Sequence, residues 1–260
     1  MKKIEPVAPE IKTGLTRHIQ DFWSRRVNAE FIMGRAVTSH ARGDDAYFGD
    51  LETQRYRSHR HLPPWIAAMT PGKTVLEIGS GVGLDTFTMA RHGLQVTAVD
   101  LTEVAVKTAR QRFERHEVPA DFLVADACHL PFPDHAFDYV YSFGVLHHVA
   151  DTEASIREVH RLLKPGGQAR IMLYHRRSLN EGVHRLLGVP FEDKDELCPV
   201  VRRFTVAEAR ELFRQFSHVE VGIEYLYGEG YGRLFRLTPR WLYDWLSRRW
   251  GWHLMIAATK

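Results

Sequence analysis

The sequence predicts a doubly wound α/β fold on a seven-stranded, mostly parallel sheet. The first observation is an alternation, from about residue 73, of short apolar runs with amphipathic helical segments through five units. Such spacing favours parallel βαβ units with right-handed crossovers and helices on both faces of the sheet. The second observation is a pair of later strand-like runs, 218–226 and 252–259, which we expect to pair with each other.

The first part of the alternation supplies three strands and two helices. The strands are short apolar runs at 73–79, 94–100 and 120–126. The helices, at 84–93 and 103–115, carry apolar residues at helical spacing. We expect Gly93 to end the first helix and Thr102 to cap the second.

The second part supplies two more strands and the helix between them. The strands are 137–143 and 168–174. Asp151 is placed to cap the helix, and the Lys-Pro-Gly-Gly stretch at 164–167 ends it. Later in the chain, Thr205 and Glu208 stand in capping-box register before another helix.

The alternation also suggests how the chain is organised. Residues 1–72 do not follow it and are expected to form an N-terminal helical arm or lid. Residues 73–260 form the main domain, with a helical insertion after the fifth strand at about 174–204.

Composition narrows the classes of protein. The formal net charge of +3 is modest for a dedicated nucleic-acid-binding protein. Two cysteines make no disulfide framework and no metal-type pair. We see neither a signal peptide nor an apolar run long enough to span a membrane, so a cytoplasmic protein is expected.

A glycine-rich turn follows the first strand, in the stretch VLEIGSGVGLD. Its spacing is G-x-G-x-G, with Leu84 where a dinucleotide-binding turn carries its third glycine. Glu77 precedes this turn, and Asp100 and Asp126 stand at the ends of the next two strands. Three carboxylates converging on one cleft repel phosphates but suit ribose hydroxyls, an amine and an ammonium group. Taken singly, Asp100 and Asp126 also read as helix-cap and turn residues.

These stretches resemble the class I S-adenosylmethionine-dependent methyltransferases. The segments VLEIGSGVGLDT, VTAVD, VADACHLPFPDHAFDYVYSFGVLHHV and LLKPGGQARIML match the successive motifs of that family in order and spacing. The resemblance covers roughly residues 73–174 and implies the Rossmann-like methyltransferase fold with S-adenosylmethionine as cofactor.

The resemblance also implies roles for individual residues. The turn glycines would let the backbone approach the methionine part of the cofactor, with Glu77 fixing that part. Asp100 and its neighbour Leu101 would lie at the ribose, and Asp126 and Ala127 at the adenine. Phe143 would lie near the ammonium group, and Tyr56 is one of the arm aromatics expected to fold over the cofactor. The implied cofactor-binding residues are Glu77, Gly79, Gly81, Gly83, Asp100, Leu101, Asp126, Ala127, Phe143 and Tyr56.

Candidates for acting on the methyl acceptor follow the fourth and fifth strands. They are His147, His148, Tyr174 and His175. A histidine with a pKa near 6.5 suits proton removal from a hydroxyl, thiol or ammonium group. The alternative reading is that these side chains only pack or bond to the backbone.

We expect a small-molecule acceptor, with oxygen, nitrogen, sulfur and carbon atoms all open. The stretch SFGV after the fourth strand lacks the Asn- or Asp-Pro-Pro-aromatic signature of base methylation, which disfavours a nucleic-acid acceptor. The rival functions are a nicotinamide-dependent oxidoreductase and a non-catalytic scaffold. No zinc spacing occurs among the fifteen histidines, so no metal site is expected. The stretch RWLYDWLSRRWGWHL reads more readily as a core-packing helix than as a helix on a membrane surface.

Overall fold

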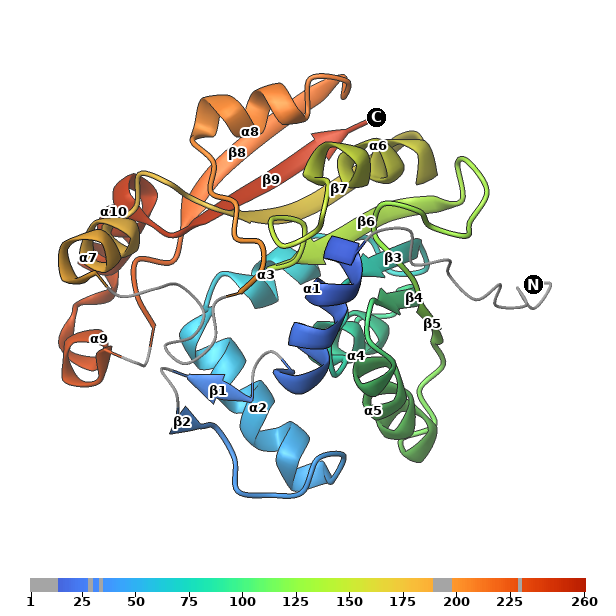
Figure 1. Cartoon of the computed structure of the whole chain (residues 1–260), viewed down its shortest axis with the longest axis horizontal. Coiled ribbons are helices and arrows are strands. Elements are labelled where there is room, and N and C mark those ends of the chain that lie inside the picture. The colour runs from blue at the N-terminus through green and yellow to red at the C-terminus, as the bar shows by residue number, and fades with distance from the viewer. Residues whose placement is uncertain (1–13, 28–29, 33–34, 189–197, 229–230) are drawn as a thin grey trace.

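The computed structural model describes residues 14–27, 30–32, 35–188, 198–228 and 231–260 (Figure 1). Its centre is a seven-stranded sheet in the order β5-β4-β3-β6-β7-β9-β8, in which β9 runs antiparallel to β7 and β8. The doubly wound, mostly parallel sheet is confirmed. Its strands are β3 (Thr74–Ile78), β4 (Gln95–Asp100), β5 (Asp121–Val124), β6 (Phe137–Phe143), β7 (Leu163–Tyr174), β8 (His218–Glu224) and β9 (His253–Thr259).

Helices cover both faces of this sheet. On one face lie α3 (Leu62–Ala67), α4 (Leu84–Arg91) and α5 (Glu103–Arg115). On the other face lie α6 (Thr152–Leu162) and α8 (Val206–Leu212). Neighbouring residues of β3 show why both faces need cover: Val75 packs with α3 and α4, whereas Leu76 packs with α6. Central parallel strands of this kind are apolar on both sides, as these are.

The N-terminal arm packs over the turn that follows β3. It contains α1 (Gly14–Arg25), α2 (Asp45–Ser58) and a small ribbon of β1 (Phe31–Ile32) and β2 (Arg35–Ala36), which the sequence did not predict. Tyr47, Phe48 and Leu51 of α2 share an apolar cluster with Val82 and Leu84 of the turn. Parts of the predicted arm, at 1–13, 28–29 and 33–34, lie outside the described residues.

Three further helices lie beside the far end of the sheet. They are α7 (Leu179–Leu187), α9 (Arg233–Leu237) and α10 (Arg240–Trp250). Part of the insertion predicted at 174–204 falls on residues 189–197, outside the described parts. Within those parts, no helix has the length and apolar character that crossing a membrane requires.

The predicted helix caps had different outcomes. Asp151 accepts the N–H of Ala154, and the Thr205–Glu208 capping box forms, so both are confirmed. Thr102 occupies the cap position, but the prediction that its side chain caps the helix is wrong. Its hydroxyl donates to Asp100 Oδ1 at 2.8 Å instead, and it makes no side-chain hydrogen bond to the N–H groups of α5.

Candidate functional site

The carboxyl ends of β3, β4, β5 and β6 open on one cavity. Glu77 of β3, Asp100 at the end of β4 and Asp126 after β5 all line it. The strand order reverses between β3 and β6, which is where ligands of open parallel sheets bind. Helix α1 adds Ile19 and Trp23 on the side opposite the sheet. The structure therefore brings the three carboxylates together beneath the N-terminal arm.

Most of the residues assigned to the cofactor by resemblance lie around this cavity. Gly83 and Tyr56 are outside its lining. Those within it are Glu77, Gly79, Gly81, Asp100, Leu101, Asp126, Ala127 and Phe143.

The three glycines of the turn differ in their surroundings. All have a positive φ, of +76° at Gly79, +53° at Gly81 and +79° at Gly83, a conformation that L side chains rarely adopt. A Cβ at Gly79 would lie 2.2 Å from Val145 Cγ2, and one at Gly83 would lie 3.0 Å from Ala109 Cβ. A Cβ at Gly81 would meet no described atom within 4 Å. Gly81 is thus the glycine with open space beside it, while the other two allow close packing.

Asp100 is held in place by the protein itself. Its Oδ2 accepts the Gly81 N–H at 2.9 Å, and its Oδ1 accepts the Thr102 N–H at 2.9 Å. Burial raises the pKa of Asp100 above its usual range, although these donors act in the opposite direction. The carboxylate is therefore oriented toward the cavity before any ligand binds.

Asp126 sits in a similar arrangement after β5. Its Oδ1 accepts the N–H of Cys128 at 2.9 Å, while Oδ2 lies 3.8 Å from His129 Nδ1. Ala127 and Leu101 line the same part of the cavity. One carboxylate oxygen thus holds the turn and the other is available at the cavity edge.

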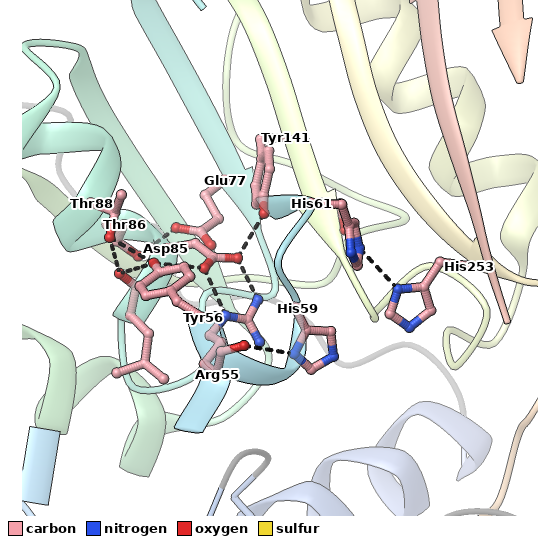
Figure 2. Close-up of polar contacts among 12 residues, drawn as sticks. Arg55, Tyr56, His59, His61, Glu77, Asp85, Thr86, Thr88, Tyr141 and His253 are labelled. Atoms are coloured by element: carbon pink, nitrogen blue, oxygen red, sulfur yellow. Dashed lines mark hydrogen bonds and ion pairs between the residues drawn. The ribbon is translucent and has the colours of Figure 1, made fainter. Parts of the chain in front are cut away.

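Glu77 is a buried carboxyl group beside other acidic residues. Burial, with the nearby charge of Asp85, raises the pKa of Glu77 well above 4.5. The hydroxyl of Thr86 donates to Glu77 Oε2, and the guanidinium of Arg55 also favours the ionised form (Figure 2). A cation bound in the cavity would stabilise the ionised form and bring this raised pKa down, so the site favours positively charged ligands.

A buried ion pair joins the arm to the glycine turn, and sequence reasoning missed it. Arg55 of α2 donates from Nε to Asp85 Oδ1 at 2.7 Å and from Nη2 to Asp85 Oδ2 (Figure 2). Tyr141 adds a hydrogen bond to Oδ2 at 2.7 Å. Burial opposes the ionisation of Asp85, but the Arg55 charge and these donors outweigh it, so the Asp85 pKa lies below its usual range. The available signal was an acid, Asp85, in the first turn of a helix between Leu84 and Phe87.

The charges around the cavity discriminate between cofactors. Its lining holds four carboxyl groups, of Glu77, Asp85, Asp100 and Asp126, against the one guanidinium of Arg55. Arg55 is already paired with Asp85, so it is not offered to a phosphate. An excess of buried acids repels a pyrophosphate and attracts a cation.

Tyr56 lies in the seam between α2 and α4, outside the lining of this cavity. Its hydroxyl lies 2.6 Å from Thr88 Oγ1 and donates to Asp85 Oδ1 at 3.0 Å. The contact with cofactor that the resemblance implied for Tyr56 stays a prediction. These hydrogen bonds tie α2 to α4.

Of the two adjacent histidines, His148 lines the cavity and His147 does not. His148 Nδ1 lies 2.7 Å from the Val200 carbonyl oxygen. A carbonyl only accepts, so Nδ1 carries the proton, and a second proton taken up by this ring would go to Nε2. His147 is fully buried, and burial lowers its pKa well below 6.5. Its ring lies against Tyr174, with centroids 3.8 Å apart.

Tyr174 and His175, the other two catalytic candidates, also lie outside the cavity lining. Tyr174 packs between His147 and Trp252, whose ring centroid is 4.4 Å away. His175 is buried, with Nδ1 2.9 Å from the Gly251 carbonyl oxygen. Catalytic roles for these two residues stay predictions.

Next to the cavity is a group of rings that we call the histidine–aromatic cluster: His59, His61, Phe143, Tyr225 and His253. The Tyr225 ring stacks on His59 at 4.6 Å and on His253 at 4.4 Å between centroids. His253 Nδ1 lies 3.2 Å from His61 Nε2 (Figure 2). Phe143 belongs to both: it lines the cavity, and its ring meets the His59 ring of the cluster edge-on.

Burial keeps the histidines of this cluster neutral. It lowers the pKa of His59 to about 3 and that of His61 to about 4, with the Arg55 charge acting in the same direction. Nowhere in the described parts of the chain do three or more His, Cys, Asp or Glu side chains form a group able to hold a metal ion.

Comparison with known proteins shows the family to which this chain belongs. A family model described as "Methyltransferase domain" matches residues 76–171. The chain is 34% identical over 179 residues to the ubiquinone biosynthesis O-methyltransferase of Chromobacterium violaceum, covering 65% of this chain and 73% of that one. The chain belongs to the class I S-adenosylmethionine-dependent methyltransferases.

Two further matches show how far the likeness to this methyltransferase extends. The 2-methyl-6-phytyl-1,4-hydroquinone methyltransferase of Synechocystis is 30% identical over 150 residues, which cover 56% of this chain and 47% of that one. Several relatives are matched over less than half of their length. Among solved structures, the cyclase SpnF has a TM-score of 0.62 at 18% identity, covering 94% of this chain and 96% of that one. At that identity the match shows the fold alone.

Proposed function

We propose that the protein transfers a methyl group from S-adenosylmethionine to a hydroxyl group on a small aromatic acceptor. The observation that supports the cofactor is the convergence of Glu77, Asp100 and Asp126 on one acidic cavity beside Gly81. When bound, this cofactor supplies a methyl group that its sulfonium charge makes electrophilic. The residues fit it, because an acidic lining favours a cation and the open backbone at Gly81 admits an amino-acid group.

Each carboxylate has a place in this assignment. Asp100 is oriented by Gly81 and Thr102 and would accept from the ribose hydroxyls. Asp126 would accept from the adenine amine through Oδ2, since Oδ1 is occupied by Cys128. Glu77 would face the positively charged end.

The protein's contribution to the transfer is alignment and the exclusion of water. Methyl transfer is an in-line displacement, in which positioning and a dry pocket contribute most of the acceleration. Ile19 and Trp23 of α1 add apolar surface to the lining of the cavity. The arm is therefore part of the reaction chamber.

Aromatic side chains in the lining of the cavity support an aromatic acceptor. Phe143 and Trp23 line it, and Trp23 also meets the His148 ring, with centroids 5.1 Å apart. The printed names of two relatives, a ubiquinone biosynthesis O-methyltransferase and a phytyl-hydroquinone methyltransferase, concern quinone chemistry. His148, through Nε2, would take the proton from the acceptor hydroxyl, a role suited to a neutral imidazole.

The test is a series of matched acceptors incubated with S-adenosylmethionine, with S-adenosylhomocysteine measured as product. Hydroquinones and catechols are expected to be methylated, while the equivalent anilines and thiophenols are not. Methylation of the amines alone would overturn the oxygen assignment. Binding of S-adenosylmethionine without methylation of any of these acceptors would overturn the proposed acceptor class.

A His148→Gln variant tests the proposed base. Turnover is expected to fall about 100- to 10,000-fold, with cofactor affinity unchanged and partial recovery as pH approaches the pKa of the acceptor hydroxyl. His218→Gln, at an exposed position on β8, is the matched control and should change neither quantity. Equal loss of turnover and cofactor affinity at His148 would indicate a structural role.

A further inference from the structure

Helices α7, α9 and α10 lie together at one end of the molecule (Figure 1), and large apolar side chains are exposed on them. Among the described residues, nine large hydrophobic side chains are exposed, and eight of them belong to α7, α9 and α10. The concentration in three helices sets this end apart from the rest of the described surface. The eight are Leu179, Leu186, Leu187, Leu234, Leu237, Trp241, Trp245 and Trp250.

Their spacing places them on outward helix faces. Leu234 and Leu237 are three residues apart on α9, and Trp241 and Trp245 are four apart on α10, so each pair shares a face. On α7 no residue is buried. The prediction that the tryptophan-rich stretch packs into the core is therefore wrong for α10, because its inward positions are taken by Tyr243 and Ser247. Only after the helix ends does Trp252 become buried.

The inner sides of these helices are well anchored. Phe235 of α9 and Tyr243 of α10 meet edge-on at 5.9 Å between centroids, and the Tyr243 hydroxyl donates to the Tyr227 carbonyl at 2.8 Å. Tyr231, just before α9, donates to Asn180 Oδ1 of α7 at 3.3 Å. The three helices are thus held by packing on their inner sides, while the large apolar side chains on their outer sides are exposed.

Basic residues are interleaved with the apolar ones. The three helices carry two acids, Glu181 and Asp244, against six exposed arginines. The whole chain has a net charge of only +3, so this end holds a local excess of positive charge. The six arginines are Arg185, Arg233, Arg236, Arg240, Arg248 and Arg249.

We propose that α7, α9 and α10 form a docking surface for an anionic phospholipid bilayer. Tryptophan rings favour the interface between lipid headgroups and acyl chains, and arginines attract anionic headgroups. Arg249 and Trp245 show the combination in one contact, with the guanidinium 4.6 Å from the ring centroid. The charge complementarity selects a membrane surface over a second copy of this chain, which would oppose arginines to arginines.

The docking surface adjoins the histidine–aromatic cluster. Arg60, between His59 and His61, stacks on Phe235 of α9 at 4.6 Å, and α10 leads through Gly251 to His253. Docking therefore brings the histidine–aromatic cluster close to the lipid. The proposal goes beyond the methyl-transfer function and holds whatever the acceptor is.

The experiment is co-sedimentation of the full chain with vesicles of phosphatidylglycerol and phosphatidylcholine, beside vesicles of phosphatidylcholine alone. We expect binding to the anionic vesicles that weakens with added salt, together with a blue shift of tryptophan emission. No binding of the unmodified protein to anionic vesicles at low salt would overturn the proposal. Equal binding to both kinds of vesicle would overturn its anionic part.

Paired variants locate the surface. Arg240→Gln with Arg248→Gln is expected to weaken vesicle binding about tenfold or more, since each arginine near an anionic surface contributes about one kcal/mol. Arg157→Gln with Arg210→Gln, exposed on α6 and α8, removes the same charge elsewhere and is expected to have little effect. Equal weakening by both pairs would contradict a local surface.

A third variant separates lipid docking from self-association. Trp241→Ser with Trp245→Ser is expected to reduce the blue shift, leaving only the contribution of Trp250, and to leave the sedimentation of the lipid-free protein unchanged. If it instead converts a dimer to a monomer, the surface joins two copies of the chain and the membrane proposal fails. All these side chains are exposed, so circular dichroism should show an unchanged fold.

Discussion

The acidic cavity and the histidine–aromatic cluster are neighbours, yet they are built in opposite ways. The cavity takes its carboxylates from successive strand ends, at 77, 100 and 126, each within a short motif. The cluster joins the segments 59–61, 225 and 253 to Phe143, although these are far apart in the sequence. Sites made from strand ends can therefore be read from a sequence, whereas sites made by tertiary packing cannot.

Their electrostatics differ as well. The cavity holds ionisable acids around one paired guanidinium, while burial keeps the cluster's histidines neutral. Changes on the cavity side should therefore act through charge, on cofactor affinity and stability. Changes on the cluster side should act through packing and leave cofactor affinity unchanged.

The largest expected effect is on the ion pair that connects the arm to the cavity. Asp85→Asn leaves the Arg55 guanidinium buried without its counter-charge, so the free energy of unfolding should fall by about 3–5 kcal/mol. Urea unfolding followed by circular dichroism measures it. The matched control is Asp244→Asn, which breaks the exposed Arg240–Asp244 pair and should cost at most about 1 kcal/mol. Similar losses of unfolding free energy in the two variants would show that the buried Arg55–Asp85 pair stabilises the fold no more than an exposed pair does.

Next in size is the contribution of Asp100 to cofactor binding. Asp100→Ala should weaken binding of S-adenosylmethionine by about 1–3 kcal/mol, because the ribose hydroxyls and the Gly81 N–H lose their acceptor. Tyr225→Phe, in the histidine–aromatic cluster, should leave cofactor affinity unchanged. Calorimetric titration gives both values. An unaffected Asp100→Ala variant would mean that the ribose assignment is wrong.

A pH dependence follows from the raised pKa of Glu77. In the free protein this carboxyl holds a proton to higher pH than usual, and a cationic cofactor has to displace that proton. Affinity should therefore rise with pH by up to about tenfold per unit and level off above the Glu77 pKa of the free protein. Asp100, whose pKa is also raised, adds to the same slope.

Titrations in two buffers of different ionisation enthalpy would detect the released proton. Glu77→Gln should bind more weakly above that pKa and with a flatter pH dependence. It should also stabilise the free protein at neutral pH. A carboxyl with a raised folded-state pKa contributes stability below its unfolded pKa of about 4.5 and loses it as pH rises through the folded value. A steep pH dependence that persists in the variant would assign the proton elsewhere.

The smallest expected effect concerns Tyr56. Removing its hydroxyl in Tyr56→Phe breaks the contacts with Asp85 and Thr88, which should lower stability by about 0.5–1.5 kcal/mol. Cofactor affinity should stay the same, because the side chain lies outside the cavity lining. A loss of affinity with unchanged stability would restore Tyr56 as a cofactor-binding residue.

Features set by residues close together in the sequence could be predicted, whereas features set by tertiary packing could not. The sheet, the Asp151 cap and the Thr205–Glu208 capping box depend on residues a few positions apart, so local patterns reveal them. The position of His148 in the cavity and of His147 behind it depends on how Val200 and Tyr174 pack, which no local pattern contains.

The Arg55–Asp85 pair was missed for the same reason. Its partners are thirty residues apart and belong to different layers of the fold. The seam they form exists only once α2 has folded over the glycine turn.

We propose that the acidic cavity selects a sulfonium cofactor rather than a dinucleotide. Calorimetric titration with S-adenosylmethionine, S-adenosylhomocysteine and NAD tests it most directly. We expect the first two to bind in the micromolar range and NAD to give no heat of binding. Binding of NAD alone would contradict the assignment of the cavity, and binding of none of the three would leave the carboxylates without their ligand.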